Sequence, residues 1–172
     1  AFCDLATCQT GGDLIKAVAT ALDLVPPAQR TQSEQAVALG HALAARSRQL
    51  LVLDNAEHLV EVGRELLSVW GRLAPQTQFV VTSRRQLGLA AEQIVALAPL
   101  TLAAMMTLFL NQAQRVCPTR RLSPQERRRL AAILERLEGN ALASLLCAGQ
   151  LGTGDFDAWA TAWETGEQNT AL

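Results

Sequence analysis

Apolar and polar positions divide this chain into a part with strand and helix patterns and a part with helix patterns alone. Short apolar runs at Phe2–Leu5, Leu50–Leu53 and Phe79–Val81 have the length of buried strands. Residues 57–73, between the last two runs, carry apolar side chains at steps of three and four, the stripe of a helix packed on a sheet. This order of strand, helix and strand predicts parallel strands joined by helical crossovers.

Three further segments belong to the first part. Leu14 to Leu22 has helical spacing, and Thr31 with Glu34 forms a capping-box pattern at the start of another helix. Gln93 to Leu97 is expected to be one more strand, which Pro99 ends.

Residues 101–165 contain no strand signal, and four helices are expected there. Thr101 and Ser123 have the sequence context of helix N-caps, and Pro124 follows Ser123 at the first helical position. The expected helices are 102–116, 127–137, 141–151 and 156–163. The predicted fold class is α/β: a partial parallel sheet with flanking helices over 1–98, an all-helical subdomain over 99–165, and a frayed tail over 166–172.

Composition adds limits on function. The 172 residues are 49% hydrophobic, which is enough for a real core, and 15 Lys+Arg balance 16 Asp+Glu. Balanced charge gives no reason to expect nucleic acid or a membrane as a partner. No apolar run reaches the roughly 18 residues of a membrane span, so a soluble, cytoplasmic chain is expected. The chain starts at Ala1 inside a strand pattern, and we expect it to be a piece of a longer protein.

Basic residues cluster locally at Arg127-Arg128-Arg129. Consecutive helical positions fan around about 200° of a helix, so the three side chains do not form one face that could read a nucleic-acid groove. No direct nucleic-acid contact is predicted from this segment.

Asp54 stands at the carboxyl end of an apolar strand, where open α/β sheets bind ligands. In a phosphate site it would hold Mg²⁺, which prefers hard oxygen ligands. The alternative is that Asp54 only caps the following helix, assisted by Asn55 and Glu57.

Arg84 ends the next strand pattern, where its guanidinium could bind a terminal phosphate bidentately. Alternatively, Thr82 to Arg85 are turn residues with solvated charges. Glu57 could polarise an attacking water, or it could only complement the dipole of the helix that we expect to begin there.

No G-x-x-x-x-G-K-[ST] phosphate loop occurs in the 172 residues. The segment Gly11-Gly12-Asp13-Leu14-Ile15-Lys16 has no second glycine before the lysine and no hydroxyl residue after it, so it is not such a loop.

Several motifs in fixed order nevertheless resemble the STAND class of P-loop ATPases, which are related to the NB-ARC modules, over about residues 1–150. Leu50-Leu51-Val52-Leu53-Asp54-Asn55 resembles the Walker B strand, and Val80-Val81-Thr82-Ser83-Arg84 resembles the sensor 1 strand. Leu137-Glu138-Gly139-Asn140-Ala141-Leu142 resembles the motif of the helical subdomain. Each match is weak alone, and their order makes them specific.

The resemblance implies a partial P-loop NTPase sheet and a switch that binds ATP or ADP with Mg²⁺ and controls a multidomain signalling or transcription-regulating protein. Asp54 would coordinate the metal, Arg84 would sense the γ-phosphate, and Glu57 would be the catalytic candidate. Gly139, Asn140, Ala141 and Leu142 would lie beside the adenine. Expected partners are the nucleotide, other domains of the same chain and, in a homo-oligomer, further copies of the chain. Any ATPase would be slow and would need the upstream phosphate loop.

Two departures from the family pattern favour an alternative, a degenerate scaffold for protein contacts. Ala141 stands where the family usually has proline, and Asn55 replaces a second acid. In this class the phosphate-loop strand would lie between the sensor 1 strand and the segment Ile94–Leu97. Without that neighbour, Ile94–Leu97 is expected either to be no strand or to expose an apolar edge.

Overall fold

The computed structural model describes residues 1–25 and 31–166. In this part the chain is a mixed α/β protein with seven helices and one parallel sheet of three strands. The chain divides into two units, Ala1–Val95 and Ala96–Leu172, whereas the sequence analysis places the division at residue 98. Each unit has its own buried apolar cluster. No helix in the described ranges combines the length and the apolar character needed to cross a membrane.

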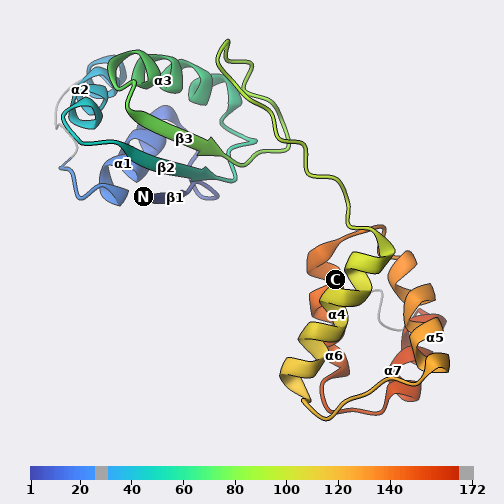
Figure 1. Ribbon diagram of the computed structural model, residues 1–172. Coiled ribbons are helices and arrows are strands. Elements are labelled where there is room, and N and C mark those ends of the chain that lie inside the picture. Colours follow the sequence, from blue (N-terminus) through green and yellow to red (C-terminus); the bar gives the residue numbers. More distant parts are fainter. Residues whose placement is uncertain (26–30, 167–172) are drawn as a thin grey trace. The chain divides into compact units, whose positions relative to one another are not determined.

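The sheet of the first unit has the spatial order β1-β2-β3 (Figure 1). Its strands are β1 (Phe2–Asp4), β2 (Gln49–Asp54) and β3 (Thr77–Val81). The helices α1 (Gly11–Ala21) and α2 (Gln32–Ala44) join β1 to β2, and α3 (Val60–Leu73) joins β2 to β3. The predicted parallel strands with helical crossovers are confirmed.

The three helices of this unit pack on one face of the sheet. Crossovers between parallel strands are right-handed, and both connections step in the same direction across the sheet, so both return over the same face. α1, α2 and α3 contact one another, and Leu51 and Leu53 on the covered face are buried. On the opposite face Phe2, Leu50 and Val80 are 61%, 47% and 47% exposed.

Side-chain caps fix the starts of the helices other than α3. The capping box of Thr31 with Glu34 and the N-caps Thr101 and Ser123 are confirmed. Thr10 forms a further capping box with Asp13, in which the threonine hydroxyl accepts from the Asp13 N–H while the carboxylate accepts from the Thr10 N–H at 2.9 Å. Hydroxyl caps of this kind satisfy backbone donors that have no partner inside the helix.

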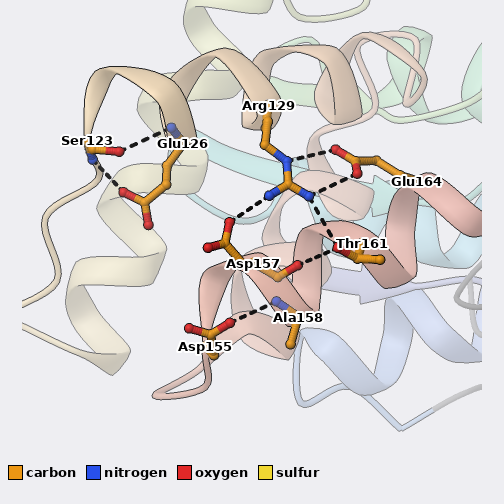
Figure 2. Close-up of polar contacts among 8 residues, drawn as sticks. All are labelled: Ser123, Glu126, Arg129, Asp155, Asp157, Ala158, Thr161 and Glu164. Carbon is orange, nitrogen blue, oxygen red and sulfur yellow. Dashed lines mark hydrogen bonds and ion pairs between the residues drawn. The ribbon is translucent and has the colours of Figure 1, made fainter.

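The second unit is helical in its described residues, as expected. It contains α4 (Leu102–Val116), α5 (Pro124–Glu135), α6 (Ala141–Leu151) and α7 (Phe156–Thr165). α4 packs on α6 and α5 on α7, around a core that includes Phe109, Trp159 and Trp163. Figure 2 shows Arg129 of α5 reaching Asp157 and Glu164 of α7.

The strand expected at Gln93–Leu97 is wrong. The segment has no strand pairing, and Ile94, Val95 and Leu97 are largely exposed. A strand needs a neighbour to bond its backbone groups, and β3 pairs within the described residues only with β2. Of the two outcomes expected for an unpaired segment, the non-strand one is observed.

Candidate functional site

The ends of β2 and β3 are tied together at the carboxyl edge of the sheet. Thr82 continues the ladder, because its N–H donates to the Leu53 carbonyl at 3.0 Å and its own carbonyl accepts from the Ala56 N–H at 3.0 Å. The Thr82 hydroxyl donates to the Asp54 carboxylate and accepts from the Asn55 N–H at 2.9 Å. Asn55 has a positive φ of 66°, which turns the chain sharply after the strand. The carboxylate of Asp54 is thereby fixed beside the end of β3.

Glu57 lies in the turn between β2 and α3, not in the helix. α3 begins at Val60, so the expected helix start at Glu57 is wrong. The N–H groups of residues 55 and 56 are bonded to Thr82, and the helix begins only after the turn that follows them. Glu57 therefore does not complement the first turn of a helix in the manner expected.

Arg84 forms an ion pair with Glu57, with 2.9 Å between Nε and Oε1. With its amide nitrogen turned toward Glu57, Asn55 donates to both carboxylate oxygens, at 3.0 and 3.1 Å. The pKa of the Glu57 carboxyl lies below its ordinary value, first because its own backbone N–H donates to it and also because Arg84 does; together these outweigh partial burial, which acts to raise it. Glu57 is therefore an anion at neutral pH, held by several donors.

A shallow pocket of about 430 Å³ opens at this edge. Its lining consists of Asp4, Asp54, Asn55, Glu57, Thr82, Ser83 and Arg84. Three of the residues predicted from the sequence, Asp54, Glu57 and Arg84, thus come together in one pocket.

Asp4 is a pocket residue that the sequence analysis did not propose. It ends β1 and is paired in register with Asp54, so the two carboxylates stand at the ends of adjacent strands. One Asp4 oxygen accepts from the Ala6 N–H at 2.9 Å. In the sequence Asp4 lies inside the apolar run Phe2–Leu5, so the pattern did not mark it as the residue at the end of a strand.

The oxygen atoms of Asp4, Asp54 and Thr82 suit a hard cation such as Mg²⁺. No group of three or more His, Cys, Asp or Glu residues placed to hold a metal occurs in the described ranges. Magnesium typically uses one or two carboxylates and takes its remaining ligands from water and substrate phosphate. The donors are compatible with Mg²⁺ bound together with a phosphate ligand.

The remaining predicted residues, Gly139 to Leu142, lie in the second unit, whereas the pocket is lined by first-unit residues. Gly139 has a positive φ of 80°, and its carbonyl accepts from the Leu100 N–H at 2.9 Å. Asn140 is the N-cap of α6 and accepts from the Ala143 N–H at 3.0 Å. Ala141 and Leu142 begin that helix, and Leu142 is 64% exposed. Each has a structural role or an exposed position within its own unit.

Glu92 organises the loop after β3, a role that sequence reasoning missed. Its carboxylate accepts from the N–H groups of Leu87, Gly88 and Leu89, at 3.1, 2.6 and 3.1 Å. Desolvation acts to raise its pKa, but the three N–H donors outweigh it, so the pKa lies below the ordinary value. Arg64 of α3 donates to the Leu87 carbonyl and ties the loop to the helix. The loop that follows Arg84 is therefore built by specific contacts.

Comparison with known proteins gives distant relatives. No family model matches the chain, and no solved structure matches it. An uncharacterized protein of Mycobacterium tuberculosis is 32% identical over 108 residues, which is 62% of this chain and 28% of the relative. A "Putative HTH-type transcriptional regulator" of the same organism is 29% identical over 105 residues, 60% of this chain and 12% of the relative. The chain thus matches under a third of the length of either relative.

Proposed function

We propose that this chain is part of a nucleotide-dependent switch of the STAND class, with a partial P-loop NTPase sheet whose pocket takes the phosphates of ATP or ADP with Mg²⁺. The observation that carries the proposal is the convergence of Asp54, Glu57 and Arg84 in one pocket at the carboxyl ends of β2 and β3. Ligands of open parallel α/β sheets bind at such edges.

In this proposal Asp54 holds the metal through an oxygen and Arg84 binds the terminal phosphate, since a guanidinium suits phosphate geometry. Mg²⁺ would neutralise phosphate charge. The nucleotide would shift the protein between two arrangements, which requires different contacts in each. Hydrolysis would be slow.

The setting of this switch is also a proposal. One relative carries the name of an HTH-type transcriptional regulator, and both relatives are longer than the matched region. We propose a cytoplasmic regulator in which this segment acts on other domains of the same chain and on further copies in a homo-oligomer.

The first test is a titration with a fluorescent ATP analogue and Mg²⁺, using this 172-residue chain beside the native protein with any residues that precede Ala1. Binding by the longer protein alone is expected, because the chain itself contains no phosphate loop. Asp54→Ala should weaken binding by roughly 10- to 100-fold, the range typical for loss of a metal-site partner. Glu61→Ala is the matched control, because this carboxylate does not line the pocket. Unchanged affinity in Asp54→Ala would contradict the assignment.

A second candidate function is a scaffold without nucleotide. The exposed sheet face with Phe2, Leu50 and Val80 favours it, since an apolar surface of this kind can serve protein contacts. If neither the chain nor the longer protein binds nucleotide, this candidate replaces the first.

A further inference from the structure

In the ion pair of Glu57 and Arg84, the carboxylate of Glu57 is fixed by several donors and the side chain of Arg84 is exposed. The side chain of Glu57 is 18% exposed, whereas that of Arg84 is 85% exposed. An ion pair with such an exposed partner contributes little to stability. Its main effect is therefore geometric: it restricts where the guanidinium of Arg84 can be.

Glu57 is a suitable anchor because several donors fix its carboxylate. Its own backbone N–H and the Arg84 side chain donate to it, and the Asn55 amide is placed to donate to both oxygens. Asn55 itself is held by the Thr82 hydroxyl at the end of β3. Glu57 thus links the ends of β2 and β3 to the guanidinium of Arg84.

The contact uses only part of the guanidinium. Arginine has five N–H donors, and the bond to Glu57 occupies Nε. Among the contacts described for residues 1–25 and 31–166, none engages the Nη1 or Nη2 groups of Arg84. These two groups suit bidentate binding of a phosphate.

We propose that Glu57 is a positioning residue that holds Arg84 at the pocket with its Nη groups free for the terminal phosphate of a bound nucleotide. This inference rests on the proposed function and makes it more specific. Glu57 then acts through Arg84, and it contributes to nucleotide affinity through the contact between Arg84 and the γ-phosphate. The pair sets the preference for a nucleoside triphosphate over a diphosphate.

A double-mutant cycle in the native protein tests this inference. The affinities for Mg-ATP and Mg-ADP are measured for the wild type, Glu57→Gln, Arg84→Gln and the double variant. Glu57→Gln keeps the size of the side chain and removes its charge. We expect ATP affinity to fall about two- to fivefold, the effect of losing one ion pair with an exposed partner. ADP affinity should change less than about twofold, and the double variant should be no weaker than Arg84→Gln alone.

The matched control is Glu61→Gln. Glu61 pairs with Arg85 at 3.3 Å, and both side chains are exposed and outside the pocket. The control should leave the ATP-to-ADP ratio unchanged. A spectroscopic measurement on the nucleotide-free chain adds a readout specific to the contact: the NMR signal of the Arg84 Nε–H group should shift in Glu57→Gln and stay in place in Glu61→Gln.

Three results would overturn the inference. The first is an equal loss of ATP and ADP affinity in Glu57→Gln, and the second is a double variant whose loss of ATP affinity is the sum of the two single losses. The third is an Arg84 Nε–H signal that does not shift in Glu57→Gln. A wild-type protein that binds neither nucleotide gives a different pattern, because it removes the proposed function together with this inference. Nucleotide binding with an unaltered ratio in Glu57→Gln removes the inference alone.

Discussion

At the scale of single residues, Gly139 has the strictest steric requirement in the motif at the start of α6. Its φ of 80° lies in the left-handed region. This backbone conformation is strained for a residue that carries a Cβ. A Cβ there would lie 2.5 Å from the Cβ of Pro99 and within 2.8 Å of backbone atoms of Leu100. Backbone does not move as readily as a flexible side chain, so glycine is required for structural reasons at this position.

Gly139→Ala should therefore destabilise the second unit by about 1–3 kcal/mol, the usual cost of strain at such a position. Denaturant unfolding followed by tryptophan fluorescence measures the change. Gly149→Ala is the matched control, because Gly149 lies inside α6 and, apart from the adjacent backbone of that helix, no heavy atom of the described residues is within 4 Å of an added Cβ. Gly149→Ala should raise the free energy of unfolding by about 0.5–1 kcal/mol. Equal stability of the two variants would contradict the steric account.

Glu92 makes the stability of the loop after β3 depend on pH. Its pKa in the folded chain lies below the ordinary value, so its contribution to loop stability is fully present above the unfolded pKa and is lost as pH falls through the folded pKa. We expect the amide NMR signals of Leu87, Gly88 and Leu89 to titrate together in acid. In Glu92→Gln that common titration should vanish. Titration of these amides that survives in Glu92→Gln would contradict the role of the carboxylate.

At the scale of elements, Arg129 of α5 bonds three residues of α7 (Figure 2), beside the bond from Arg136 to the Trp163 carbonyl at 2.8 Å. Arg129 donates through Nε and Nη2 to the two Glu164 oxygens at 3.0 and 2.9 Å, and through Nη1 to Asp157 at 2.6 Å. Thr161 accepts a further bond at 3.3 Å. The fork of donors on one rigid group holds three successive turns of α7.

Arg129→Lys should lower the thermal midpoint of unfolding by a few degrees, because a lysine ammonium does not reproduce the planar fork. Arg128→Lys is the control, since the bond that Arg128 makes among the described residues is to its own helix, at the Pro124 carbonyl. High salt should reduce the difference between the two variants by screening the ion pairs. Equal midpoints at low salt would contradict the structural role of Arg129.

Elements with local signals were predictable from the sequence, and those that depend on neighbours were not. The hydroxyl caps at Thr31, Thr101 and Ser123 are short-range features and were predicted. The strand at Gln93–Leu97 failed because strand formation depends on a pairing partner. The helix start at Glu57 failed because bonds to Thr82, far along the chain, hold the preceding residues.

The candidate site shows the same division. Asp54 and Arg84 were found because each ends an apolar run, and parallel strands bring such ends to one edge. The partner of Glu57 was not predicted, because an ion pair between residues 27 positions apart leaves no local pattern. Asp4 was not predicted, because the sequence places it inside the run Phe2–Leu5 and only the structure shows that β1 ends there.

At the scale of the whole molecule, the first unit has a sheet with one covered face. Phe2, Val52 and Val80 are in register across the three strands, and Leu50 belongs to the same face. Three of the four are among the exposed large apolar residues. Exposed apolar side chains gathered on one face of a sheet can serve as a contact surface.

The chain should therefore bind an apolar fluorescent dye in its folded state. Val80→Lys should reduce the dye signal while circular dichroism stays unchanged, because the side chain points away from the helices. Val37→Lys is the matched control, since Val37 is also exposed but lies on α2. An equal dye signal in the wild type and Val80→Lys would show that the dye does not bind at the exposed face of the sheet.

The charges of the pocket determine which form of a phosphate ligand can approach it. Three carboxylates, Asp4, Asp54 and Glu57, face one guanidinium, which leaves a formal excess of two negative charges. A bare polyphosphate is repelled by such a field, whereas a divalent cation is attracted. For the proposed nucleotide this imposes an order of addition: the metal enters before the phosphates or together with them. Chelating the metal should then slow association more than it speeds release.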